Sequence, residues 1–332
     1  MNKLLVVLGL VMLLLFERVT GTKAAYVYYG VHVVGYPLNL TNVSQFETDA
    51  KRKASIVMIY QGWGTSNNDP NFNPTMMDSI RSRGSIPMIT WQPEDFITSQ
   101  IQPTYSLLNI INGAFDSYIT NYALAVKAWN HPIFIRFAHE MNGNWYPWSE
   151  QINGNSSGQY VQMWQHVHDI FTAQGVTNVT WAWTPMNTDE NGQLGNLAHY
   201  YPGDAYVDWV GIDGYNWGTS QTWSHWQNFA DIFYNAYYEI AGITQKPMMI
   251  GETASTEVGG NKATWISDTL QNFIPNMFPK IKALIWFNEN KEQDWRIESS
   301  ARSQTSFSRY INNGIYSTNL FGNISISPIQ PL

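Results

Sequence analysis

Eight short apolar runs, rich in β-branched and aromatic residues, recur along the chain with helical patterns between most of them. Uninterrupted apolar runs are typical of strands buried on both faces, and strands that alternate with helices form a parallel sheet. Eight strands close such a sheet into a barrel. An open doubly wound sheet is the rival, but no run is followed by a phosphate-binding glycine loop. The pattern therefore predicts an α/β fold, a single (β/α)8 TIM barrel.

The expected strands span residues 26–33, 56–60, 86–91, 133–138, 179–184, 207–211, 247–251 and 281–287. The expected helices span residues 42–53, 74–83, 115–130, 159–174, 223–241, 261–273 and 299–313, with at most a short helix at 196–201. The tail after Tyr316 is expected to pack on the barrel as a closing segment.

The first 24 residues have the pattern of a signal peptide. Lys3 precedes a 13-residue apolar run that is too short to cross a bilayer, and small residues follow it. We expect residues 1–24 to be removed and residues 25–332 to form one catalytic barrel domain. The protein is then secreted and extracellular.

Composition narrows the classes of function. The net charge is −7 and no run of Lys or Arg occurs, so we expect neither a nucleic-acid partner nor a membrane partner. The absence of cysteine excludes a cysteine nucleophile and a thiolate metal site. The chain has 15 Trp residues and 15% aromatic residues, a content that suits the binding of apolar sugar faces.

Two glutamates stand where expected strands end. Glu140 follows the strand at 133–138 and precedes an aromatic loop, and Glu252 follows the strand at 247–251. Active sites of such barrels lie at the carboxyl ends of the strands, and glycoside hydrolysis uses two carboxyl groups. A metal-binding helix motif would need a second His at position 143, which is Gly143. The pattern predicts a paired-carboxylate site without a metal.

Other strand ends carry aromatic and polar candidates. Arg136 is expected to point from the fourth strand toward a catalytic carboxylate, while Trp181 and Trp183 suit packing and sugar binding equally well. The remaining candidates for substrate contact are His139, Trp145, Trp63, Trp91, Asp213, Tyr215, Trp286 and Trp295.

Four segments carry a resemblance to glycoside hydrolase family 26, a family of retaining (β/α)8 hydrolases best known for endo-β-1,4-mannanases. They read R-F-A-H-E-M-N-G-N-W-Y-P-W, G-I-D-G-Y-N-W, I-G-E-T and W-F-N-E-N-K-E-Q-D-W, in the order of the family's motifs. The resemblance implies that Glu140 is the acid/base and Glu252 the nucleophile. It implies substrate contacts for His139, Trp145, Trp286 and Trp295, a hydrogen bond from Tyr215 to the nucleophile, an orienting role for Asp213, and no cofactor.

Three functions are compatible with these residues. The first is a secreted, retaining endo-β-1,4-mannanase that hydrolyses mannan or glucomannan, acting as a monomer. The second is a mixed-linkage β-1,3-1,4-glucanase with the same catalytic groups. It stays open because Arg136-Phe137-Ala138 and Trp91-Gln92-Pro93 depart from the pattern of many mannanases. The third is an inactive carbohydrate-binding barrel, which the presence of both glutamates and Tyr215 disfavours.

Overall fold

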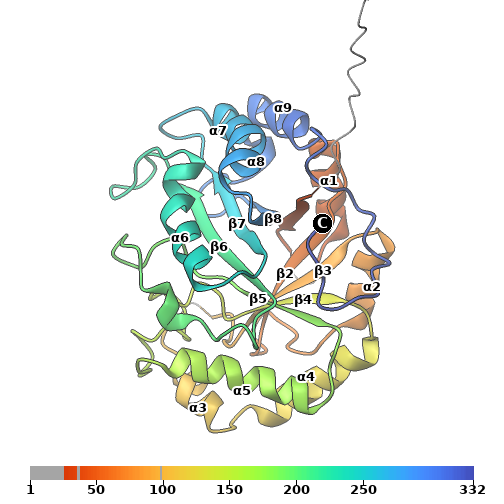
Figure 1. Cartoon of the computed structure of the whole chain (residues 1–332), viewed down its shortest axis with the longest axis vertical. Helices are drawn as coiled ribbons and strands as arrows, with labels where there is room; N and C mark the ends of the chain where they lie inside the picture. The colour runs from red at the N-terminus through yellow and green to blue at the C-terminus, as the bar shows by residue number, and fades with distance from the viewer. Residues whose placement is uncertain (1–25, 36–37, 98) are drawn as a thin grey trace, which may run out of the picture.

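The computed structural model describes residues 26–332, apart from 36–37 and 98, and its strands close into one parallel barrel (Figure 1). Each strand pairs with the next along the chain, and the last pairs with the first. The barrel prediction is confirmed, whereas the predicted signal peptide lies outside the described residues. The strands are β1 (Tyr28–Val33), β2 (Ile56–Gly62), β3 (Ile86–Gln92), β4 (Ile133–Phe137), β5 (Val179–Trp183), β6 (Trp209–Asn216), β7 (Met248–Ser255) and β8 (Ile281–Asn288).

Helices surround the barrel (Figure 1). The α-helices are α1 (Leu40–Ala50), α2 (Pro74–Ser82), α3 (Leu107–Ile111), α4 (Asp116–Trp129), α5 (Gln159–Ala173), α6 (Phe229–Ile243), α7 (Lys262–Asp268), α8 (Ile274–Met277) and α9 (Ala301–Tyr310). Shorter turns are η1 (Pro103–Tyr105), η2 (Leu197–Tyr200), η3 (Thr269–Phe273) and η4 (Ile297–Ser299). Within the described ranges, no helix combines the length and the apolar character that a membrane crossing requires.

All seven expected helices are present, with different ends. Helix α6 begins at Phe229 instead of residue 223, because Asn228 and Asp231 form a reciprocal capping box there. The helix expected at 261–273 passes through the π-helical turn η3 and continues as α8 to Met277. The short helix at 196–201 is confirmed as η2, and α3 was not predicted.

Strands β6 and β7 run further toward the carboxyl end than the apolar pattern suggests. Their pairing continues through Asp213 opposite Glu252 and Tyr215 opposite Ala254, after a register shift at Ile212. Glu252 therefore lies inside a strand and not at its tip. The residue before it must be glycine, because a Cβ on Gly251 would lie 2.5 Å from Oδ1 of Asp213.

Alternation along the strands divides the buried side chains into two sets. Outward-facing residues pack against the helices. Inward-facing residues fill the amino-terminal half of the barrel with an apolar plug and leave polar side chains at the carboxyl end. The plug consists of Tyr28, Ile56, Met58, Ile86, Met88, Phe134, Ala182, Trp209, Met249, Ala283, Ile285 and Ile329.

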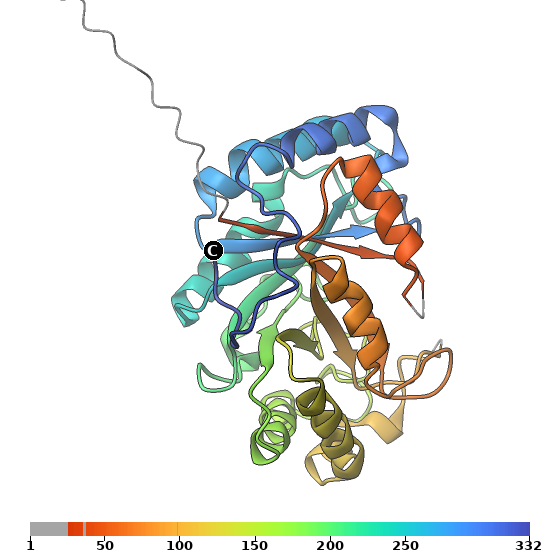
Figure 2. The ribbon, with the colours of Figure 1, turned by 90° about the vertical axis from the view of Figure 1, so that its right-hand side faces the viewer.

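The C-terminal segment closes the amino end of the barrel, and its dark blue trace can be followed past the strands in Figure 2. Ile329 is 1% exposed and joins the apolar plug. Its backbone N–H donates to Oγ1 of Thr180 at 2.8 Å, and its carbonyl accepts from Nε1 of Trp209 at 2.7 Å. The expected closing role of the tail is confirmed.

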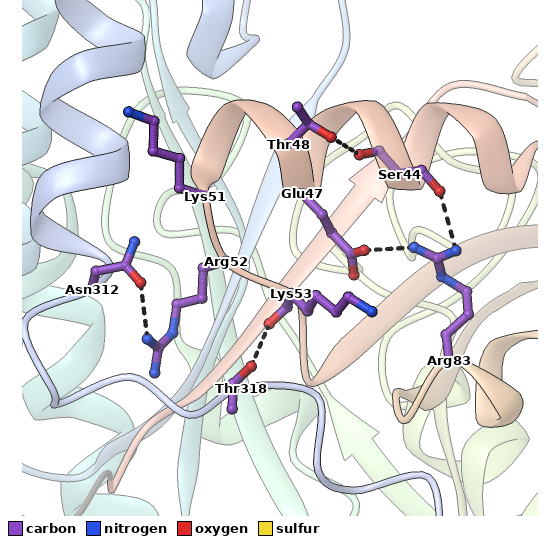
Figure 3. A pocket seen from close by; sticks show the side chains of 9 residues that line it. All are labelled: Ser44, Glu47, Thr48, Lys51, Arg52, Lys53, Arg83, Asn312 and Thr318. Carbon is purple, nitrogen blue, oxygen red and sulfur yellow. Dashed lines mark hydrogen bonds and ion pairs between the residues drawn. The ribbon is translucent and has the colours of Figure 1, made fainter.

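A basic surface pocket at the same end joins α1, the residues after α2 and the tail (Figure 3). Arg52 donates to Oδ1 of Asn312 at 3.1 Å, and Arg83 donates to Oε2 of Glu47 at 2.5 Å. Both guanidinium groups are thus held by acceptors of the protein itself. The pocket is a structural junction, at the end of the barrel opposite the predicted site.

Candidate active site

The two predicted glutamates come together at the carboxyl end of the barrel. One carboxylate oxygen of Glu140, one of Glu252 and a ring nitrogen of His139 all lie within 4.8 Å of one another. Glu140 is 8% exposed and Glu252 is 5% exposed, so both carboxyl groups are largely removed from water. Burial of this kind penalises the charged form of a carboxyl group unless specific partners compensate.

Glu140 is presented by a strained turn that ends β4. Ala138 and Glu140 have φ angles of 43° and 51°, in the left-handed region that L-residues rarely adopt. Each costs about 1–3 kcal/mol and persists only where neighbours hold it. Here the Glu140 N–H donates to the carbonyl of Thr184 at 2.8 Å, and the indole of Trp148 donates to the carbonyl of His139 at 2.7 Å. These contacts aim the Glu140 side chain across the barrel.

Glu252 is held ionised by donors on both of its oxygens. Nη1 of Arg136 donates to Oε1 at 2.7 Å, and the hydroxyl of Tyr60 makes a short hydrogen bond to the same oxygen. The hydroxyl of Tyr215 donates to Oε2 at 2.5 Å. Burial alone would raise the pKa of Glu252, but the Arg136 charge and these hydrogen bonds lower it to about 2. Glu252 is therefore an ionised carboxylate across the whole neutral and mildly acidic range.

Arg136 is the fully buried cation at the centre of this arrangement, as its position on β4 predicts. It also donates to Oγ1 of Thr90 at 3.0 Å and makes a short ion pair with Asp213. Asp213 pairs with Arg136 and is completely buried, so it is out of reach of a sugar. Its burial does not fit the expected substrate contact, whereas its contact with Arg136 fits the orienting role that the resemblance implies.

Glu140 has the opposite protonation preference. Burial raises the pKa of Glu140 to about 7, and the negative charge of Glu252 adds to the effect. The indole N–H of Trp145 donates to Oε2 of Glu140 at 2.6 Å and opposes the shift, as does the Arg136 charge. Glu140 therefore carries a proton below about pH 7 while Glu252 does not. When the pKa values of two neighbouring carboxyl groups are pushed apart, the protonated group can act as an acid and the ionised group as a nucleophile or base.

His139 is buried between the two glutamates and Tyr146. Its Nε2 lies 3.1 Å from the Tyr146 hydroxyl and 3.8 Å from Oε1 of Glu252. Burial and the nearby Arg136 charge hold the pKa of His139 well below its usual range, so the ring is neutral. The positive charge that stabilises the Glu252 carboxylate is therefore that of Arg136.

His139, Glu140 and Glu252 form the one group with metal-ligand spacing among the described residues. The fit to a metal ion is poor, because Arg136 already neutralises Glu252 at 2.7 Å and would repel a cation. The chemistry of the donors suits a proton-transfer pair better than a metal centre.

Three predicted sugar-binding tryptophans point away from the site, so the prediction is corrected for them. On β3 the alternation turns Thr90 and Gln92 inward, which sends Trp91 outward to stack on Tyr122 with 4.5 Å between ring centroids. Trp63 and Trp286 are likewise packed among other rings, with 5% and 0% of their surface exposed. No indole face remains available there for a sugar.

The remaining tryptophans divide between the site and the packing. Trp145 lies at the site, half-buried and bonded to Glu140. Trp295 is 1% exposed, and its ring packs 5.0 Å from that of Tyr215, so it supports the tyrosine that binds Glu252 and offers no free face. Trp181 and Trp183 lie in the outward-facing core, which resolves the open alternative in favour of packing.

Sequence reasoning missed Tyr60 on β2, together with His32 on β1 and Phe287 on β8. The three rings touch one another, with 4.6 Å between the centroids of His32 and Tyr60 and 5.1 Å between those of His32 and Phe287. Alternation was the available signal, because Met58 and Tyr60 share the inward face of β2.

A closed parallel barrel that brings one protonated and one ionised carboxyl group together at its carboxyl end has the arrangement that glycoside hydrolases use. The chain belongs to glycosyl hydrolase family 26, whose model matches residues 72–270. The resemblance carried by the four sequence segments is thereby confirmed.

Endoglucanase H of Acetivibrio thermocellus is 40% identical over 286 residues, which cover 85% of this chain and 30% of that protein. A mannan endo-1,4-beta-mannosidase of Bacillus subtilis is 30% identical over 166 residues, covering 48% of this chain and 40% of that protein. The chain thus spans less than half the length of either relative. The catalytic domain of a Bacillus sp. JAMB-750 endo-beta-1,4-mannanase shares the fold, with a TM-score of 0.67 and 18% identity over 90% of this chain and 91% of that one.

Proposed function

We propose that this chain is a retaining endo-β-glycanase that cleaves a 1,4-linked β-glycan backbone by double displacement. The observation that carries the proposal is the approach of the Glu140 and Glu252 carboxylate oxygens to within 4.8 Å. Retaining glycosidases hold their two carboxyl groups about 5–5.5 Å apart, whereas inverting enzymes leave about 6.5–9.5 Å for a water molecule. The spacing supports direct attack by a carboxylate.

In the first step the ionised Glu252 forms a bond to the anomeric carbon of the bound sugar. The bond from that carbon to the leaving oxygen breaks, and Glu140 gives its proton to this oxygen. Tyr60, Tyr215 and Arg136 orient the attacking carboxylate and keep it unprotonated beforehand.

In the second step a water molecule attacks the same carbon and passes its proton to Glu140. The bond to Glu252 breaks, and the carboxylate returns to its donors. The Glu252 charge is absent in the covalent intermediate, so the pKa of Glu140 falls at the moment when Glu140 must accept a proton.

For the backbone sugar we propose a β-glucan that contains 1,4 linkages, with β-mannan as the second candidate. The relative named as an endoglucanase matches 85% of the chain at 40% identity, which favours glucan over the mannan expected first. The relative named as a mannosidase matches 48% of the chain at 30% identity and keeps mannan as the alternative.

The test is reducing-sugar release from barley β-glucan, lichenan, glucomannan and mannan, combined with NMR of the first anomer formed. We expect the highest kcat/KM on a β-glucan and a β-anomer as the first product. The variant Glu252→Ala controls for contaminating hydrolases and should lose at least ~10³-fold of the activity. Turnover of none of these polysaccharides, or an α-anomer as the first product, would refute the proposal.

We further propose that residues 1–24 direct secretion and that the mature enzyme acts as a monomer. The support is the apolar run after Lys3 and the nature of the substrate, an extracellular polymer. N-terminal sequencing of protein recovered from the medium should begin near residue 25, and sedimentation should give the mass of one chain. An intact Met1 in the medium would contradict the first part, and a dimer mass the second.

A further inference from the structure

A further buried carboxyl group, that of Glu94, lies just after β3 and takes no part in the double displacement. Gln92 ends β3 on its inward face, two residues beyond Thr90, which binds Arg136. Glu94 follows after Pro93. Gln92 and Glu94 are 4% and 9% exposed, so both side chains are nearly as buried as the catalytic glutamates.

The two side chains bind each other. Nε2 of Gln92 donates to Oε1 of Glu94 at 2.8 Å. Among the described residues, none donates to the other oxygen of Glu94, Oε2, and that oxygen is not sealed from solvent. Glu94 thus keeps one oxygen for a ligand while Gln92 holds the other.

The carboxyl group is not required for the loop's own geometry. The backbone carbonyl of Glu94 accepts from the N–H groups of Trp63 and Gly64, each at 2.9 Å, and these bonds join the loops after β2 and β3. They are independent of the side chain. The Glu94 carboxyl is therefore held in place by a loop that would form without it.

The segment that carries Gln92 and Glu94 borders the turn that carries Glu140, because the carbonyl of Trp91 accepts from the N–H of Ala138 at 3.0 Å. Burial raises the pKa of Tyr146, and the charges of Glu140, Glu252 and Glu94 each raise it further, so Tyr146 lies within range of all three. Its hydroxyl also contacts His139. Burial raises the pKa of Glu94 itself to about 8, with a smaller contribution from Asp95. The group is thus a neutral acid with an O–H donor at the pH where Glu140 is protonated.

We propose that Glu94, held by Gln92, is a sugar-binding carboxyl group that recognises a hydroxyl of the sugar bound beside Glu140 and Glu252. A carboxylic acid both donates and accepts hydrogen bonds, and so does a sugar hydroxyl. A polar group that a bound ligand buries weakens binding unless it finds such a partner. Because the group is neutral, it adds no negative charge to that of Glu252.

This proposal rests on the proposed glycanase activity and adds a determinant of specificity. Glucose and mannose differ only in the direction of the hydroxyl at C2. A group that binds one sugar hydroxyl in a rigid setting discriminates between such isomers, because the wrong isomer leaves the buried partner unpaired.

The test compares Glu94→Met with Glu94→Gln, two uncharged side chains of similar size. The amide of Gln keeps a donor and an acceptor, whereas Met keeps neither. We expect Glu94→Met to lower kcat/KM on the preferred polysaccharide about tenfold, the value of one neutral hydrogen bond, and Glu94→Gln to stay within about threefold of wild type. The ratio of kcat/KM on barley β-glucan to that on glucomannan should change in Glu94→Met. A matched control is Glu47→Gln, a buried carboxyl group at the opposite end of the barrel, whose ratio should equal that of wild type.

Each outcome separates this proposal from the glycanase proposal. If the wild-type enzyme has no activity on any β-glycan, both the glycanase proposal and the Glu94 proposal are refuted. An active wild type with unchanged kinetics in Glu94→Met refutes the role of Glu94 alone. Equal losses of kcat/KM in Glu94→Met and Glu94→Gln would also refute it. The same holds if the loss of activity only follows the folded fraction measured by thermal unfolding, while the ratio of kcat/KM on the two polysaccharides stays unchanged.

Discussion

Nη1 of Arg136 lies 2.7 Å from Oε1 of Glu252, and this contact between two buried side chains keeps the proposed nucleophile ionised. Arg136 comes from β4, the same strand that presents Glu140 three residues after it ends. One strand therefore supplies both the acid and the cation that keeps the opposite carboxylate ionised. Closure of the barrel brings Arg136 to Glu252, so the fold itself sets the pKa of Glu252 and the pH dependence expected of the enzyme.

Replacing Arg136 by Met should move the acidic limb of kcat/KM to higher pH. Glu252 must be ionised to attack, and burial without the guanidinium raises its pKa from about 2. Loss of one partner from a buried ion pair also costs about 3–5 kcal/mol of stability. A pH–rate profile and chemical denaturation measure the two effects. Arg296→Met, at a partly exposed ion pair with Asp294, is the control. An unchanged acidic limb would show that another group keeps the pKa of Glu252 low.

The wild-type profile should fall on the alkaline side with an apparent pKa near 7, because Glu140 must hold a proton to donate. In Glu140→Gln, measured with an aryl glycoside whose leaving group needs no acid, that limb should vanish while the acidic limb remains. Added azide should give a β-glycosyl azide. A persistent alkaline limb in this variant would assign the proton to a different residue.

Trp145→Phe should move the alkaline limb to higher pH. The indole N–H stabilises the ionised form of Glu140 and so lowers its pKa, and Phe removes that donor while keeping a ring for sugar stacking. Glu140 then stays protonated to higher pH. The measurement is the pH dependence of kcat/KM on polysaccharide. A limb displaced to lower pH would mean that the indole acts by excluding water and not by donating.

Tyr60→Phe and Tyr215→Phe should each lower kcat/KM by roughly 10–100-fold, the range expected for a hydrogen bond to a charged group. Each hydroxyl donates to a different oxygen of Glu252, so the double variant should lose more than either single one. Tyr29→Phe is a matched control, because the buried Tyr29 hydroxyl has no hydrogen-bond partner within the described part of the chain. Kinetics and melting temperature together decide the result. A loss of stability without a kinetic change would make either hydroxyl structural.

Ile329→Ala should destabilise the barrel without changing its kinetics. The side chain fills the amino end of the apolar plug, and truncation of a buried Ile costs about 2–5 kcal/mol. Urea denaturation gives the difference, and Leu332→Ala, at an exposed position, should show none. If the two variants unfold at the same urea concentration, the tail does not seal the barrel.

The fold was predictable because the apolar runs that form the strands are continuous in sequence. Hydrophobic periodicity is a local property, and it located all eight strands and the short helix η2. The ends of β6 and β7 were not predictable. Their extension depends on pairing between Asp213 and Glu252 across two strands, and no local pattern encodes that pairing.

The proposed catalytic pair was visible in the sequence because each glutamate follows its own apolar run, and the resemblance to family 26 implied their roles. The sequence alone therefore determined the barrel and the family, and it singled out Glu140 and Glu252 as candidates. Tertiary structure decided which aromatic rings face the substrate. It buried Trp91 and Trp286 behind the sheet and turned Tyr60 inward, because alternate residues of a strand point to opposite faces and register chooses between them. The protonation of the pair was decided in the same way, since burial and the Arg136 charge exist only when the strands of the barrel are assembled.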